Sequence, residues 1–124
     1  QQQRSAPARS VGSAEPDSRI VAKLSEIVGL RERLAMTYEH LLAAGRASAD
    51  GLAEVDLAEA RVELARERGE RDAILAELRG LVAAHERRMK RLGSLARDRV
   101  SSDEIDRAQV ALLEAQVRLM RAQK

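Results

Sequence analysis

The sequence lacks phenylalanine, tryptophan and cysteine, and it has a single tyrosine, Tyr38. Large globular cores rely on aromatic side chains for much of their buried area, so this chain has little material for such a core. The absence of cysteine excludes disulfide bonds and thiolate metal sites. No apolar run approaches the roughly 20 residues that a membrane-spanning helix needs, so we expect no transmembrane segment in this chain.

The residues that are present are typical of long helices. Leucine, alanine, valine and isoleucine alternate with charged residues, which make up 34% of the chain. That mixture is typical of coiled coils. The 22 basic and 20 acidic residues nearly cancel, and this balance suits a solvated helical surface better than a nucleic-acid-binding one. We therefore expect a single all-α domain with no nucleic-acid partner.

Residues 1–18 differ in composition from the rest of the chain. They contain both prolines, Pro7 and Pro16, and almost no large apolar side chain. Such a stretch cannot bury enough surface to offset the entropy lost on ordering. We predict a flexible leader over 1–18, followed by a helical hairpin domain over 19–124.

The first helix is predicted to begin with Asp17 or Ser18 as its N-cap and to end near Gly45. Its apolar residues recur at alternating spacings of four and three, which is typical of a heptad seam. Arg31 occupies the one polar position of that seam. The apolar members are Ile20, Leu24, Ile27, Leu34, Tyr38 and Leu41.

The second helix is predicted to run unbroken from about residue 52 to about residue 97, after a cap at Ser48 or Asp50. No proline interrupts it, although Gly69, Gly80 and Gly93 each weaken it by roughly 1 kcal/mol relative to alanine. We expect bends or close helix contacts at these glycines. Its second half carries a heptad seam made of Leu75, Leu78, Val82, His85, Met89, Leu92 and Ala96.

The third helix follows a turn at Arg99 and Val100. Ser101 or Ser102 is expected to cap it, and Ser101 with Glu104 fits the capping-box pattern. This helix carries two apolar seams. The first consists of Ile105, Ala108, Leu112, Ala115, Leu119 and Ala122, and the second of Val110, Leu113, Val117 and Met120. The second seam predicts another neighbour, such as a second copy of the chain, so we assign self-association to its four residues.

These lengths predict two coiled-coil hairpins placed end to end. A turn followed by a helix occurs twice, over 46–64 and 99–119, and short turns force antiparallel neighbours. Three antiparallel helices would then share one long central helix of roughly 69 Å, with one turn at each end of a rod. The alternative is a compact three-helix bundle, in which the two seams of the third helix form one wide stripe.

The stretch RRMKRLGSLARDRVSSDEIDRAQVALLEAQVRLMRAQ, residues 87–123, resembles the helical hairpins of HlyD-family periplasmic adaptors and TolC-family outer-membrane efflux proteins. Those hairpins often turn through G-x-[IV]-S, followed by acidic and apolar residues. Here Val100 and Ser101 occupy the turn, and Asp98 stands where the families have glycine. The resemblance implies a periplasmic or cell-envelope component of an efflux or secretion conduit. The alternative is a cytoplasmic coiled-coil adaptor subunit of a larger complex.

The resemblance also implies a partner-binding tip. Adaptors of this kind carry R-x3-L-x6-S around the turn, which Arg91, Leu95 and Ser102 match. Arg97 and Arg99 add positive charge, so we predict docking onto a protein with an acidic surface. The alternative is a merely solvated tip, in which Leu95 packs inside the hairpin and Ser102 is only a cap. Acidic residues concentrate between Asp50 and Glu63, which the rod places toward its opposite end.

The residues offer little for catalysis. The two histidines, His40 and His85, would lie roughly 45 Å apart in the rod and could not share a metal ion. No pair of carboxylates sits in an evident apolar pocket that would tune a pKa, and no glycine-rich phosphate loop follows a strand. We therefore expect no enzymatic activity, no catalytic residues, no metal site and no cofactor.

Overall fold

A computed structural model describes residues 15–48, 51–95 and 100–124 of the chain. The described residues form helices joined by turns, which confirms the all-α class. Four helices follow one another: α1 (Ser18–Ala43), α2 (Ala53–Arg68), α3 (Arg71–Gly93) and α4 (Ser102–Gln123). Most of the predicted leader, residues 1–14, lies outside the described part.

The predicted long helix is wrong, because the chain reverses at Gly69. This residue has φ +72°, and its amide donates to the carbonyls of Ala65 and Arg66, which ends α2. α3 begins two residues later, at Arg71. A residue with a Cβ loses roughly 1–2 kcal/mol in the left-handed conformation, whereas glycine does not. The chain therefore folds α2 back onto α3 instead of extending it.

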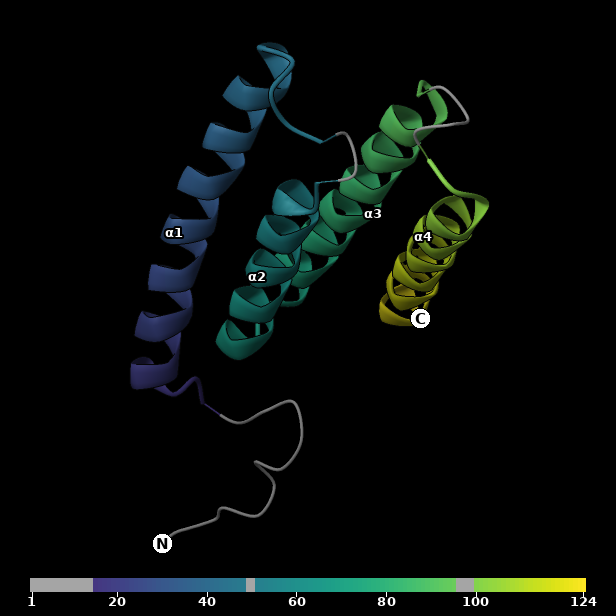
Figure 1. Cartoon of the computed structure of the whole chain (residues 1–124). Helices are drawn as coiled ribbons and strands as arrows, with labels where there is room; N and C mark the ends of the chain where they lie inside the picture. Colours follow the sequence, from purple (N-terminus) through teal and green to yellow (C-terminus); the bar gives the residue numbers. More distant parts are fainter. Residues whose placement is uncertain (1–14, 49–50, 96–99) are drawn as a thin grey trace, which may run out of the picture.

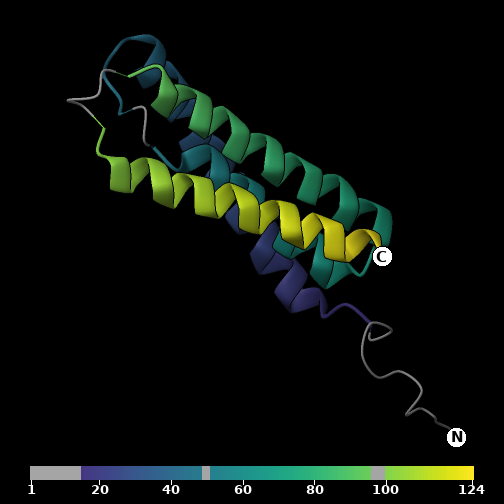
Figure 2. The same cartoon turned by 90° about the vertical axis from the view of Figure 1, so that its right-hand side faces the viewer.

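The four helices form an open array in which each helix packs against the next in antiparallel fashion. Contacts join α1 to α2, α2 to α3 and α3 to α4. α1 and α4 lie at opposite edges of the array (Figure 1), and the turned view shows that α3 lies behind α4 (Figure 2). Within the described helices, no Cα of α1 comes within 8 Å of a Cα of α4. Neither the predicted end-to-end rod nor the three-helix bundle describes this arrangement.

The main core lies where α2, α3 and α4 meet. Leu78 and Leu81 of α3 are completely buried there, and each contributes about 1.5–3 kcal/mol by leaving water. Small side chains on the facing helices let the backbones approach. The buried members of this cluster are Val55, Ala58, Val62, Leu78, Leu81, Ala84 and Ala115. α1, all of which is described, adds no buried residue.

Two predicted helix caps are confirmed. The Asp17 carboxylate accepts from the amide of Arg19 at 2.9 Å at the start of α1. At α4, Ser101 and Glu104 form the predicted capping box: the Ser101 hydroxyl accepts from the Glu104 amide at 3.1 Å, and the Ser101 amide donates to Glu104 Oε1 at 3.2 Å. These bonds satisfy helix amides that would otherwise lack partners.

The predicted cap of the second helix is not found at Ser48. α2 begins at Ala53 after Leu52, without a side-chain cap. Ser48 instead serves the turn before α2, where its carbonyl accepts from the Tyr38 hydroxyl at 2.6 Å. Asp50, the other predicted cap, lies outside the described residues.

The reversal at Gly69 generates a prediction with an internal control. A Cβ at Gly69 meets no atom within 4 Å, so only the positive φ opposes a side chain there. Gly69→Ala should lower the free energy of unfolding by about 1–2 kcal/mol. Gly80 lies in the middle of α3 with the same open space around it, so Gly80→Ala should raise that free energy by about 1 kcal/mol. Urea unfolding followed by circular dichroism measures both changes, and equal signs for the two variants would contradict this account.

Candidate functional site

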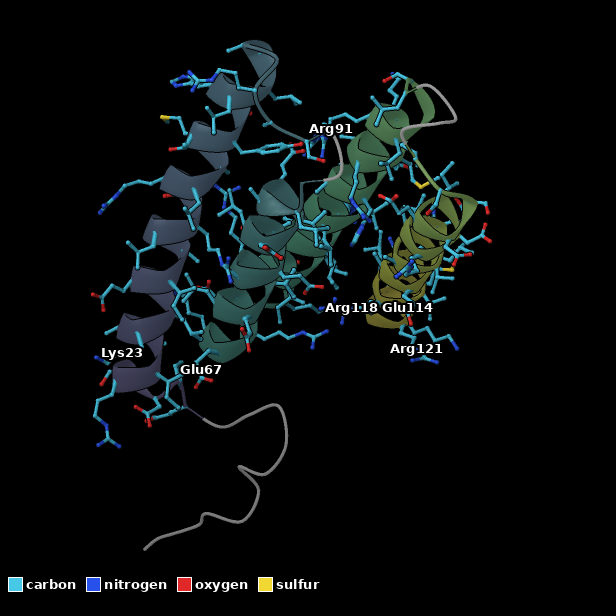
Figure 3. The ribbon with its side chains drawn as sticks, viewed as in Figure 1. Lys23, Glu67, Arg91, Glu114, Arg118 and Arg121 are labelled. Carbon is cyan, nitrogen blue, oxygen red and sulfur yellow. The ribbon has the colours of Figure 1, made fainter. Side chains whose placement is uncertain are left out.

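A groove of about 740 Å³ lies between α2 and α4. Apolar side chains of both helices line its sides, among them Val55, Val110 and Leu113. Its charged lining comes from Asp56 and Glu59 of α2 and from Glu114, Arg118 and Arg121 of α4. Figure 3 shows the last three side chains on α4. The groove therefore combines an apolar lining with charges of both signs.

A bidentate ion pair crosses this groove. Arg118 Nη1 donates to the two carboxylate oxygens of Glu59, at 3.0 Å and 2.8 Å. The pair joins α4 to α2, although the main packing partner of α4 is α3. Such charge-assisted bonds hold two helices in a defined relative position.

His85 lies beneath the groove, on α3. Its imidazole is 6% exposed, and Nδ1 finds no hydrogen-bond partner among the described residues. Burial is the largest cause that lowers the pKa of His85 below its ordinary value; the Glu59 carboxylate opposes this shift, and the cations of Arg88 and Arg118 add to it. His85 therefore lies where three helices meet, in surroundings that favour its neutral form.

Three of the four residues predicted for self-association, Val110, Leu113 and Val117, line the groove, and Met120 lies on the same helix. Val110, Leu113, Val117 and Met120 are all exposed. Val110 and Val117 each follow a buried alanine, Ala108 or Ala115, by two residues, which corresponds to about 200° around the helix. This apolar stripe, called the α4 stripe, therefore faces away from α3, and self-association through it stays a prediction.

α1 carries a second exposed apolar stripe, formed by four residues of the predicted heptad seam. Ile20, Ile27, Leu34 and Leu41 recur every seven residues and are all exposed. The neighbouring positions Leu24, Arg31 and Tyr38 are partly buried instead. One half of the predicted seam is therefore partly buried, and the other half is exposed. The four exposed residues are called the α1 stripe.

The two stripes border the same side of α2. Arg31 of α1 pairs with Asp56 of α2 at 3.6 Å, and Asp56 lines the groove. Ile27 and Leu34 lie four residues before and three residues after Arg31, so they share its face of α1. The α1 stripe and the α4 stripe thus flank a trough that contains Asp56 and Glu59. We call this surface the open face; it is turned toward the viewer in Figure 1, because α3 lies behind α4.

Two residues of the predicted partner-binding tip, Arg91 and Leu95, are engaged within the chain. Leu95 is partly buried against the small core under the α3–α4 turn, which contains Leu92, Val100 and Ala108. Ser102 is the exposed first residue of α4. Arg97 and Arg99 lie outside the described residues. Docking through these residues and Arg91 stays a prediction.

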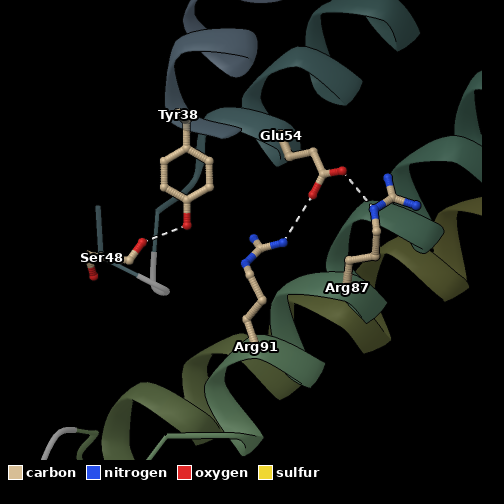
Figure 4. Close-up of polar contacts among 5 residues, drawn as sticks. All are labelled: Tyr38, Ser48, Glu54, Arg87 and Arg91. Atoms are coloured by element: carbon tan, nitrogen blue, oxygen red, sulfur yellow. Dashed lines mark hydrogen bonds and ion pairs between the residues drawn. The ribbon is translucent and has the colours of Figure 1, made fainter. Parts of the chain in front are cut away.

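Arg91 takes part in a polar cluster that links α1, α2 and α3 (Figure 4). Its Nη1 donates to one oxygen of Glu54 at 3.2 Å, and Arg87 Nε donates to the other oxygen at 2.7 Å. The Arg91 guanidinium also lies 5.7 Å from the centre of the Tyr38 ring, within range of a cation–π interaction. The side chains of Arg91 and Glu54 are only 19% and 25% exposed, so this cluster is partly shielded from water.

The described residues hold no clustered metal ligands and no membrane-spanning helix. In the part of the chain that the structure describes, no three histidine or carboxylate side chains gather to hold a metal ion. No described helix is long and apolar enough to cross a membrane. The open face offers apolar area flanked by paired charges, an arrangement typical of protein interfaces.

Comparison with known proteins adds no relative. No protein-family model, no curated protein and no solved structure matches the chain. The resemblance to HlyD-family and TolC-family hairpins therefore stays a prediction from residues 87–123.

The environment of His85 predicts that stability depends on pH. The unfolded chain, in which histidine has its ordinary pKa of about 6.5, binds more protons than the folded chain below that pH. The free energy of unfolding should therefore fall as the pH falls below about 6.5. His85→Leu should remove most of this loss between about pH 7 and 5.5, whereas His40→Gln, at an exposed position, should retain it. Urea unfolding across this range measures the effect, and an unchanged slope in the His85→Leu chain would contradict it.

The Glu54 cluster predicts a stronger contribution than that of an ordinary surface ion pair. Glu54→Gln removes the charge that Arg87 and Arg91 share, and should lower the free energy of unfolding by about 1–2 kcal/mol. The matched control is Glu32→Gln, which breaks an exposed pair with Arg61 and should change it by less than about 1 kcal/mol. Thermal and urea unfolding compare the two variants; equal losses would mean that the cluster acts like any exposed pair.

Proposed function

We propose that this protein is a non-enzymatic helical module for protein–protein assembly and that the open face is its interface. The observation that carries the proposal is the pair of exposed apolar stripes: the α4 stripe borders the trough, and the α1 stripe lies beside Arg31, which pairs with Asp56 in the trough. Soluble proteins rarely leave large contiguous apolar patches exposed without an interaction to cover them. Helical stripes of this kind match the apolar face of another helix.

The charges of the open face support a protein partner. Asp56 and Glu59 in the trough are paired with Arg31 and Arg118, so the trough offers no concentrated charge of one sign. A surface of balanced charges with apolar edges favours another folded protein over a polyanion such as nucleic acid.

The cellular setting follows from the resemblance alone. Hairpins similar to residues 87–123 belong to efflux and secretion conduits, so we place the module in the periplasm or cell envelope. The second candidate is a cytoplasmic coiled-coil adaptor subunit, which would use the same open face. Fractionation of the cells that make the protein distinguishes the two settings.

The open face generates a direct test. Leu113→Glu with Val117→Glu places two charges on the α4 stripe, where burial in an interface would be costly. Sedimentation equilibrium of the purified chain and co-purification from the source cells should show association, with itself or with another protein, that this variant loses. Circular dichroism should show that its helices remain.

The control for this test is Gln109→Glu with Gln116→Glu. Both glutamines of α4 lie outside the α4 stripe, and Gln109 is exposed. This variant adds the same charge beside the stripe and should retain association. Absence of association in the native chain, or equal association in both variants, would contradict the proposed interface.

A further inference from the structure

The two stripes of the open face are arranged so that a second copy of the chain can cover both at once. Successive helices alternate in direction, so α1 and α4 run antiparallel at opposite edges. A two-fold axis parallel to the helices, in front of the open face, brings α1 of one copy onto α4 of the other, and the reverse contact forms by symmetry. Each stripe then meets an antiparallel helix, as every helix pair within the chain does.

We propose that two copies associate in this way, with α1 of each copy packed antiparallel on α4 of the other and Leu34 opposite Leu113. The inference rests on the proposed function and names its partner. In this register Leu30 faces Val117 and Ile27 faces Met120, since residues that meet along the contact line of two antiparallel helices keep a constant sum of residue numbers. Residues that meet on the two flanks keep a sum that is two lower on the trough side and two higher on the outer side. All these side chains are exposed in the single chain, so the pairing removes apolar area from water on both helices.

The charges beside the stripes fit the same register. Glu114 of α4 lines the trough, and Arg31 lies on the trough side of α1. In the proposed dimer, Glu114 of one copy lies opposite Arg31 of the other. Glu114 is the only acidic residue on that flank of α4, and Arg31 is the only charged residue on the matching flank of α1. The other two level pairs on this flank bring cations against uncharged side chains: Arg121 against Leu24, and Arg107 against Tyr38.

The outer flanks also avoid conflict. On α4 this flank carries glutamine at every heptad, namely Gln109, Gln116 and Gln123. Glutamine can donate to or accept from either sign of charge. The outer flank of α1 carries Glu26, Arg33 and His40 at the matching levels, so no like charges oppose one another along either edge.

The charges disfavour the simplest alternative, in which α4 pairs with α4 of the second copy. An antiparallel pairing of the α4 stripe with itself places Glu114 opposite Glu114 of the second copy. It also places Arg107 opposite Arg121. Like charges directly across a helix pair oppose association, so α1 is the better partner for the α4 stripe.

The absence of cysteine from the chain allows a clean cross-linking test. A mass-tagged Leu34→Cys chain is mixed with an untagged Leu113→Cys chain and oxidised gently. The main product should be the disulfide between the two different chains, because a disulfide needs Cα atoms about 4.4–6.8 Å apart. The control replaces Leu34→Cys with Met36→Cys, which is exposed but lies about 200° away around α1, and should give little of the mixed product.

The other products of this mixture overturn the pairing. Dimers of Leu113→Cys chains alone would show that α4 pairs with α4, and dimers of Leu34→Cys chains alone would show that α1 pairs with α1. No dimer at all would show that no second copy covers the open face. The native chain could instead co-purify with a different protein that the Leu113→Glu, Val117→Glu variant no longer binds. In that case the proposed function stands, and only the proposal that a second copy is the partner is wrong.

A charge exchange tests the register independently of cysteine. Arg31→Glu and Glu114→Arg should each raise the dimer dissociation constant roughly three- to tenfold, because each creates a like-charge pair. The double variant restores opposite charges across the pairing and should dissociate less readily than the product of the two single effects, although Arg31→Glu also breaks the pair with Asp56 within the chain. A double variant as weak as the product of the two single effects would overturn the pairing of Arg31 with Glu114, and circular dichroism checks that all three chains are folded.

Discussion

The reversal of the chain at Gly69 determines which surfaces of the molecule meet. A left-handed residue ends α2, and α3 returns along it, so that Val62 and Ala58 of α2 face Leu78 and Leu81 of α3 in one core. Without the reversal, α2 and α3 would form one rod and could not pack on each other. The position of α4 depends on the same event, because Ala115 completes that core.

The reversal also brings opposite charges together. Acidic residues near the start of α2 and basic residues near the end of α3 would lie far apart on an unbroken helix. In the folded chain Glu54 binds both Arg87 and Arg91. Glu54 therefore balances part of the dense positive charge before the α3–α4 turn. Because this charge is partly paired within the chain, the open face is a better candidate interface than that turn.

The open face exists because the two edge helices use only part of their apolar surface. α4 packs through alanines, Ala108 and Ala115, which allow a close approach to α3, while Val110, Leu113 and Val117 stay exposed on the opposite side. α1 has no buried residue and is held to α2 partly by the ion pairs of Arg31 with Asp56 and Glu32 with Arg61. Exposed ion pairs contribute little stability, so α1 gains most from a partner that covers its stripe. His85 lies beneath the trough, and burial lowers its pKa, so we expect the stability of the same region to depend on pH.

The sequence alone determined the features that depend on residues a few positions apart. The helical class, the Asp17 cap, the Ser101–Glu104 capping box and the spare stripe on α4 all follow from interactions or periodicities within one or two turns. Tertiary structure decided the rest. The predicted long helix contains three glycines, at 69, 80 and 93. The chain reverses at Gly69 because this reversal lets α2 and α3 bury their apolar side chains in one core. Two further features depend on side chains more than 20 residues away in sequence. One is the choice of which half of the α1 seam is buried, and the other is the pairing of Arg91 with Glu54 rather than with a partner protein. Local patterns carry no information on such pairings, because the free energy that selects them comes from burying surfaces that meet only in the folded chain.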